Sequence, residues 1–411
     1  MDSTEQTSTI QLSPFPYHLA LRNHLLARTK TWEWFSKEDN REKQNEETKK
    51  MLLKNAYRLD RVSSSQLYAI ADEVCKILAI DAQVVMYQEM NSLQLNAGVV
   101  ILDQEAHIIL SGGIINLLDN DEMKSILAHE LSHYLFYKTD EGQFETTNRI
   151  IVAMANDSGS EDAIIETARI YKLYMELFCD TGSLKVCNDY QTVIRALVKL
   201  DTGLTNVDAS SFLEQANEIL AGSNEVTGDY THPESYIRAM ALKLKSENHP
   251  EYLSTVKNWI EGKIDIDRLD IFKQKEMQTL THDIIQLIVK PAWICSATVL
   301  NMCEQYFQNF SKSETKPLEK VSTVTSTAAE SVKTYLSYVL FDFSRVDSSL
   351  ENNPMAHTFE IAEQLGMHED YERIIRKELK LSVKEFRNYI SLAIKELQQT
   401  KESSNETIYN E

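Results

Sequence analysis

The chain has 411 residues, of which 11 are Gly and 7 are Pro. This is far below the roughly 12% of a typical chain, which excludes a collagen, a Pro/Gly-rich disordered chain and a turn-dense β-sandwich and favours long helices. The 42 Lys and Arg stand against 62 Asp and Glu, and the net charge of −20 argues against nucleic-acid binding and against docking on anionic membranes.

The first part of the chain predicts helices followed by a small sheet. Residues 14–56 have a helical composition, and residues 63–78 repeat apolar positions along one helical face. Three apolar, β-branched runs follow at 82–87, 97–102 and 107–110, and the polar residues between the last two predict a hairpin or a tight loop. This is the only sheet that the sequence predicts.

The remainder of the chain is predicted to be mostly helical. One helix begins at Asp119 or Asn120, either of which can cap it, and runs to about Lys138. Another spans about 160–181 and is expected to end at Gly182, because glycine is common just beyond a helix. The predicted fold class is therefore α+β, predominantly α-helical.

Several features favour a soluble cytoplasmic protein. The first twelve residues are polar and lack the apolar segment of a signal peptide. No apolar run reaches the roughly 18 residues of a spanning helix, since the best candidate, 284–300, is interrupted by Lys290 and Pro291. The five cysteines are an odd number without a CxxC pair, which favours reduced thiols over a disulfide framework.

An HExxH motif, HELSH at residues 129–133, falls inside one predicted helix. Residues four apart share a helical face, so His129 and His133 can bind one zinc ion, with Glu130 as general base toward a metal-bound water. Roughly 0.02 chance matches are expected in a chain of this composition. The alternative interpretation is a pair of solvent-facing histidines on an amphipathic helix.

A third metal ligand is available on the next helix. Zinc hydrolases use three protein ligands and leave the fourth position to water. Glu176 can complete a His₂Glu site, and Asp180, four residues on, can accept a hydrogen bond from a ligand imidazole. The alternative is an acidic pair on a solvated helix.

Another candidate element is the sequence Thr-His-Pro-Glu at 231–234, with Arg238 shortly after it. A His or Arg near the zinc ion can stabilise the oxyanion of a tetrahedral intermediate. The alternative is structural, because His232 followed by proline is also typical of a loop-to-helix boundary.

The ordered motifs resemble the gluzincin metallopeptidases of the HtpX and CAAX prenyl protease type. HELSH (129–133), ELFCD (176–180) and THPESYIR (231–238) occur in the order found in that family. Segment 95–113 is also similar, with an Asn-Ala strand and a Ser-Gly before the HExxH helix. The resemblance covers about 61–244, and the ordered set is far more specific than any one motif.

The resemblance implies a ligand set and a base. His129, His133 and Glu176 would bind one zinc ion per chain. Glu130 would be the base that later protonates the leaving amine. Asp180 would be a hydrogen-bonding partner behind the ligands.

The resemblance also implies substrate contacts. His232 would contact the oxyanion or the substrate, and Arg238 would support it through the aspartate or the substrate. Asn96, Ala97 and Gly98 lie on a candidate edge strand, with which an extended peptide would pair through main-chain hydrogen bonds.

Two departures from the family pattern stand out. Many members are embedded in membranes, whereas this chain has no predicted span and resembles the soluble members. The family commonly has alanine where this chain has Cys179. A thiol at that position lies beside the predicted site and can be oxidised or compete for metal.

The sequence therefore predicts a soluble zinc metalloendopeptidase that hydrolyses a peptide or protein substrate. The alternative is a peptide- or protein-binding module on a metallopeptidase fold, latent or inactive, with protein partners held by the helical extensions. Five regions are expected: an N-terminal helical extension (1–60), the metallopeptidase domain (61–245), a helical extension (246–310), a Ser/Thr/Lys-rich linker (311–330) and a C-terminal helical domain with a frayed tail (331–411).

Overall fold

A computed structural model describes most of the chain. The described residues are 12–37, 41–221, 226–228, 231–313 and 318–408. The fold class is α+β and predominantly helical, as predicted.

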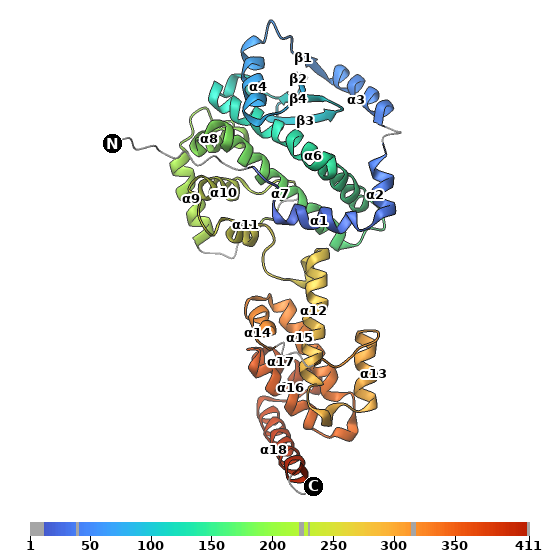
Figure 1. The fold of residues 1–411 in the computed structure, drawn as a ribbon. Helices are drawn as coiled ribbons and strands as arrows, with labels where there is room; N and C mark the ends of the chain where they lie inside the picture. Colours follow the sequence, from blue (N-terminus) through green and yellow to red (C-terminus); the bar gives the residue numbers. More distant parts are fainter. Residues whose placement is uncertain (1–11, 38–40, 222–225, 229–230, 314–317, 409–411) are drawn as a thin grey trace, which may run out of the picture. The chain divides into compact units, whose positions relative to one another are not determined.

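The chain divides into two compact units, which are described separately: unit 1 ends at Gly262 and unit 2 begins at Lys263. The helices and strands of unit 1 are shown in Figure 1 and follow in chain order. They are α1 (Pro16–Leu26), α2 (Thr29–Ser36), α3 (Arg41–Asn55), β1 (Ala56–Arg58), α4 (Ser65–Leu78), β2 (Gln83–Glu89), β3 (Asn96–Leu102), β4 (Glu105–Ser111), α5 (Ile114–Leu117), α6 (Asn120–Ala155), α7 (Asp162–Cys187), α8 (Tyr190–Thr202), α9 (Ala209–Ala221), α10 (Ser235–Ser246) and α11 (Tyr252–Ile260).

The sheet has the strand order β1-β2-β4-β3. Strands β2 and β4 are parallel, with Val85 opposite His107, and β3 is antiparallel to β4, with Gly98 opposite Ile109. The predicted hairpin between β3 and β4 is confirmed, and its turn places Asp103 at a φ of 54°. The three-residue strand β1 was not predicted, because so short a segment has no recognisable alternation. Strand β3 lies at an edge of the sheet.

One core of unit 1 lies between the sheet and helices α4 and α6, whose places are shown in Figure 1. Val74 of α4, Ile108 of β4, and Leu127 and Leu131 of α6 are fully buried in one cluster. The apolar residues of α6 thus attach it to the sheet and leave its other sides available to α7 and α8, against which it also packs.

Helices α6 and α7 are both longer than predicted. Helix α6 continues beyond Lys138 through a break at Thr139–Gly142, where Asp140 and Glu141 have positive φ values of 51° and 57°. Helix α7 does not end at Gly182, and the expectation of a helix end there is wrong. It ends at Cys187, and Asn188, which caps it, takes the left-handed conformation at a φ of 52°.

Gly182 is instead required by close packing of the two helices. A Cβ atom at this position would lie 1.9 Å from the Oγ atom and 2.8 Å from the Cβ atom of Ser132 on α6. Because only glycine lacks a Cβ, the backbone of α7 approaches α6 more closely here than any other residue allows.

Unit 2 is helical throughout its described elements. These are η1 (Ile266–Arg268), α12 (Ile271–Ile288), η2 (Ala292–Ile294), α13 (Ala297–Tyr306), α14 (Leu318–Thr327), α15 (Glu330–Arg345), η3 (Ser348–Leu350), α16 (Asn353–Gln364), α17 (His368–Leu379) and α18 (Val383–Ile408). One core unites Ile284 of α12, Val321 of α14, Leu340 of α15, Met355 of α16 and Tyr371 of α17.

The predicted regions differ in detail from these units. Helix α14 lies inside the segment 311–330, which was expected to be a linker, because its buried residues Val321 and Thr325 attach it to the core of unit 2. The expected extension 246–310 contains α11 of unit 1 and α12 and α13 of unit 2. The expected frayed tail is helical as far as Ile408, where the described residues end. The five regions as such stay a prediction.

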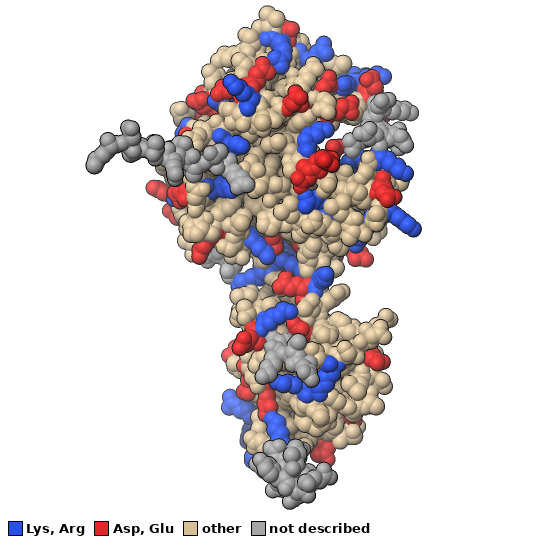
Figure 2. All heavy atoms as spheres, in the orientation of Figure 1, with Lys and Arg blue, Asp and Glu red and all other residues tan. Residues whose placement is uncertain are grey.

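The distribution of surface charge and the hydropathy of the helices are relevant to contacts with membranes and with other molecules. Figure 2 shows Lys and Arg side chains interspersed with Asp and Glu over the visible face of each unit. None of the helices in the described ranges combines the length and the apolar composition needed to cross a bilayer.

Candidate metal centre

The helix that carries the HExxH motif has a well-fixed start. The Asp119 carboxylate accepts a hydrogen bond from the backbone N of Glu122 at 2.9 Å, and the Glu122 carboxylate accepts one from the backbone N of Asp119 at 3.0 Å. This reciprocal cap satisfies two backbone donors at the first turn of α6. Glu122 is itself buried and accepts a hydrogen bond from Lys199 of α8 at 2.8 Å. The position of α6 along its axis is therefore fixed at this end.

Two histidines and a glutamate meet between α6 and α7. The Nε2 atom of His129 lies 3.1 Å from Oε2 of Glu176, and the Nε2 atom of His133 lies 3.8 Å from Oε1 of the same carboxylate. The two imidazole centroids are 5.1 Å apart. The structure thus brings together the three residues that sequence analysis predicted as metal ligands.

Asp180 and Arg238 lie behind His129. The Nδ1 atom of His129 is 3.0 Å from Oδ1 of Asp180, and Arg238 donates to both Asp180 oxygens at 2.6 and 2.8 Å. Because an ionised carboxylate only accepts hydrogen bonds, Nδ1 of His129 carries the proton. The Nε2 atom is then directed at Glu176, which is the arrangement that a metal-binding imidazole needs.

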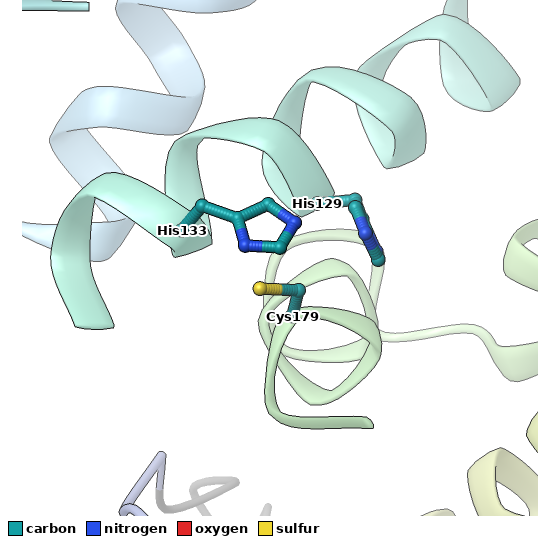
Figure 3. Close-up of side chains that lie close together, drawn as sticks. All are labelled: His129, His133 and Cys179. Carbon is teal, nitrogen blue, oxygen red and sulfur yellow. The ribbon is translucent and has the colours of Figure 1, made fainter. Parts of the chain in front are cut away.

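Cys179 also belongs to this cluster. Its Sγ atom and one ring nitrogen each of His129 and His133 all lie within 4.8 Å of one another (Figure 3). The side chain is fully buried. The sequence placed Cys179 beside the site, as a thiol that can be oxidised or compete for metal, but did not include it in the predicted ligand set. The available signal was its position three residues after Glu176, on the same helical face.

His232 lies at the rim of the cluster. Its Nε2 atom is 3.5 Å from Oε2 of Glu176, and its side chain keeps 55% of its surface exposed. Its Nδ1 atom is 3.0 Å from the hydroxyl of Thr231. His232 precedes α10, the helix that also supplies Arg238, so one short segment contributes to both the exposed and the buried sides of the site.

Asn96, Ala97 and Gly98 are outside this hydrogen-bonded cluster. They lie at the start of β3, where Asn96 is exposed and the other two are half-buried. Within the described residues, the opposite side of β3 has no strand partner. Helix α6, which carries the two histidines, packs against β3, the strand that has this free edge.

Burial and hydrogen bonding separate the pKa values of the two histidines. Burial by itself lowers the pKa of His129, but hydrogen bonds to Asp180 and Glu176 outweigh it and raise that pKa to about 10. His133 has no such bond, and burial lowers its pKa to about 4. In the metal-free chain His129 therefore carries a proton on each ring nitrogen, with Nδ1 donating to Asp180 and Nε2 donating to Glu176.

The acidic groups differ in a corresponding way. Burial raises the pKa of Glu130 to about 7, whereas hydrogen bonding to His129 and the charges of His133 and His232 overcome burial and lower the pKa of Glu176. Burial also raises the pKa of the Cys179 thiol, and the nearby Glu176 and Glu130 charges add to this. Glu176 is thus ionised and faces the imidazoles, while Glu130 gains or loses its proton near neutral pH.

This donor set fits a divalent metal ion. Tetrahedral zinc with ligand bonds of about 2.0–2.1 Å holds its nitrogen and oxygen donors about 3.3 Å apart. The observed distances from Glu176 oxygens to His129 and His133 nitrogens are 3.1 and 3.8 Å. Two imidazoles, a carboxylate and a neighbouring thiol are donors suited to a borderline-soft cation, and a metal ion would replace the Nε2 proton of His129.

Comparisons with known proteins bear on the family. The SprT-like family matches residues 65–148, which include strands β2, β3 and β4 and the HExxH motif. The plastoglobule-localized metallopeptidase 48 of Arabidopsis thaliana chloroplasts is 28% identical over 228 residues, or 50% of this chain. The match covers 65% of that protein, slightly less than two thirds of its length. No solved structure matches the chain. These likenesses support a zinc metallopeptidase-type family for this chain.

Proposed function

We propose that this protein is a zinc-dependent metalloendopeptidase of the gluzincin type that its motifs resemble, with one zinc ion per chain. The observation that carries the proposal is the meeting of His129 and His133 of α6 with Glu176 of α7, at 3.1 and 3.8 Å. Glu130 lies between the two histidines in sequence and is itself buried. The similarity to a plant metallopeptidase also supports the proposal.

Zinc bound by these residues would polarise the scissile carbonyl and lower the pKa of a water molecule. The chain's own groups do the rest. Arg238 holds Asp180, and Asp180 holds the Nδ1 proton of His129, so the ligand ring keeps its orientation. Glu130 takes the proton of the attacking water and returns it to the leaving nitrogen, a task suited to a pKa of about 7.

His232 supplies the remaining charge stabilisation in this proposal. Its exposed position, 3.5 Å from Glu176, leaves it able to donate a hydrogen bond to the oxygen of the carbonyl under attack. The substrate is an extended peptide or unfolded protein that pairs with the free edge of β3 at Asn96, Ala97 and Gly98. Pairing through the main chain gives affinity without a strict sequence requirement.

The decisive experiment is the substitution Glu130→Gln. Glutamine keeps the shape of the side chain but cannot accept the proton of water. We expect the variant to retain one zinc ion per chain by mass spectrometry and to lose about 10²- to 10⁴-fold in casein cleavage. Glu214→Gln, an exposed substitution on α9, is the matched control and should cleave like the unmodified chain.

Two outcomes would contradict the proposal. Normal cleavage by Glu130→Gln would show that the mechanism is wrong. One zinc ion per chain without turnover of any peptide by the unmodified protein would favour the peptide-binding alternative.

The location of the protein is part of the same proposal. The name of the Arabidopsis relative places that protein at chloroplast plastoglobules. A cytoplasmic location for this chain stays a prediction, based on its scattered cysteines. Cell fractionation with an antibody to the native protein would test it.

A further inference from the structure

The cluster between α6 and α7 holds one metal-binding side chain that the proposed mechanism does not use. Cys179 follows Glu176 by three residues on α7, so both side chains lie on the face directed at α6. Its Sγ atom lies within 4.8 Å of a ring nitrogen of His129 and of His133. Figure 3 shows its side chain extending into the space beside the His133 ring.

The thiol is also buried without a hydrogen-bonding partner. Cys179 has no exposed surface. Among the hydrogen bonds between described residues, none involves its sulfur, whereas the sulfur atoms of Cys187 and Cys295 approach backbone oxygens at 3.9 and 3.2 Å. A buried thiol that makes no hydrogen bond to a described residue and lies beside two imidazoles is placed as a metal ligand would be.

We propose that Cys179 is an alternative ligand of the metal ion, so that the centre has an open and a closed arrangement. The inference rests on the proposed function, because it uses the same ion. In the open arrangement His129, His133 and Glu176 bind the metal and water takes the fourth position. In the closed arrangement the same three residues stay bound, and the sulfur of Cys179 occupies the fourth position in place of water.

The closing step is a simple ligand exchange. A sulfur–metal bond forms, the bound water leaves, and the thiol proton passes to solvent, so no oxidant or reductant is required. Soft thiolate sulfur binds zinc and cobalt far better than magnesium or calcium. Cys179 would therefore also favour zinc over the hard cations that a carboxylate-rich site accepts.

Cobalt(II) and zinc can report this bond directly in the full-length chain. Cobalt-loaded protein should show a near-ultraviolet thiolate-to-cobalt charge-transfer band, and zinc-loaded protein should show X-ray absorption from a sulfur at about 2.3 Å beside nitrogen and oxygen at about 2.0–2.1 Å. Both signals should disappear in Cys179→Ala and Cys179→Ser. The matched control, Cys187→Ala on the same helix, should keep them.

Turnover gives an independent readout. If half of the sites are closed at rest, Cys179→Ala should cleave casein about twofold faster, because the activity follows the open fraction. The serine variant keeps the side-chain volume and guards against an effect of packing alone. Circular dichroism of both variants checks that they fold.

The outcomes separate this inference from the proposed function. Cobalt d–d bands without a charge-transfer band, together with zinc bound only by nitrogen and oxygen, would overturn the role of Cys179 and leave the metallopeptidase proposal intact. A charge-transfer band that persists in Cys179→Ala would overturn it too. Failure of the unmodified chain to bind either metal would overturn both.

Discussion

At the scale of single residues, His18 of α1 shows how burial sets a protonation state. The imidazole has no exposed surface and lies 4.7 and 4.8 Å, centroid to centroid, from the rings of Phe136 and Tyr171. Its Nδ1 atom accepts from the backbone N of Phe15 at 3.2 Å, and its Nε2 atom donates to the carbonyl of Tyr171 at 3.1 Å. One neutral tautomer satisfies both bonds, and burial lowers the pKa to about 3.

The lowered pKa predicts that His18 makes stability depend on pH. In the unfolded chain His18 binds a proton below pH 6.5, whereas in the folded chain it stays neutral until the pH falls to about 3. The contribution of His18 is therefore complete above pH 6.5 and is lost as the pH falls. We expect the unfolding free energy of both proteins to fall between pH 7 and pH 5.5. The fall should be about 1 kcal/mol larger in the unmodified chain than in the His18→Gln variant. Urea unfolding followed by near-ultraviolet circular dichroism measures the difference, and equal losses in the two proteins would refute the prediction.

The candidate site was largely predictable from residue spacing. The four-residue spacing of His129 and His133, and of Glu176 and Asp180, places each pair on one helical face whatever the tertiary fold. The spacing does not reveal which faces meet, so the contact of Arg238 with Asp180 was only one of two alternatives. Cys179 was predicted to lie beside the site and to be able to compete for metal, but a single cysteine without a paired partner did not indicate a ligand.

At the scale of elements, the α6–α7 contact determines the geometry of the metal centre. Gly182 of α7 lies against Ser132 of α6, inside the HExxH motif, and the Ser132 hydroxyl donates to the carbonyl of Ala128 at 2.6 Å. The sequence suggested a helix end at Gly182 because a glycine in isolation signals a cap. Only the neighbouring helix explains its presence, and that neighbour is not visible in the local sequence. Long helices and the hairpin were predictable because their patterns are local.

Gly182→Ala should therefore separate the two helices. The new Cβ would fall 1.9 Å from the Ser132 hydroxyl oxygen, and we expect a loss of about 1–3 kcal/mol in unfolding free energy together with weaker zinc binding. Chemical denaturation and metal titration measure the two effects. Gly113→Ala, with no atom within 4 Å of the added Cβ, is the control and should change neither. Ser132→Gly in the same chain should restore part of the loss, and unaltered stability of Gly182→Ala alone would contradict the packing argument.

At the scale of the whole molecule, each core cluster described above lies within one of the two units. The buried clusters around Val74 and around Leu213 contain only residues of unit 1, and the cluster around Leu340 contains only residues of unit 2. The candidate metal ligands all belong to unit 1. The division at Gly262 was not predictable, because Gly and Pro are too scarce in this chain to mark its linkers.

A fragment of residues 1–262 should accordingly fold and bind zinc. Because the clusters around Val74 and around Leu213 lie entirely within this fragment, we expect its thermal midpoint to lie within about 4 °C of the corresponding transition of the full chain, or about 1 kcal/mol. Calorimetry measures the midpoint, and mass spectrometry measures the zinc content. A fragment that stays unfolded at neutral pH with zinc present would show that unit 1 depends on unit 2.

The break in α6 at Thr139–Gly142 has a consequence for variation among related chains. A residue inserted into an uninterrupted helix rotates every later side chain by about 100° about the axis. At this break, where Asp140 pairs with Arg22 of α1, the backbone already leaves the helical path and can absorb an added or deleted residue. The half of α6 with the histidines keeps its phase against α7, and the half with Phe144 keeps its phase against α1. Insertions and deletions in homologous sequences should therefore concentrate at 139–142 and be rare on either side of it.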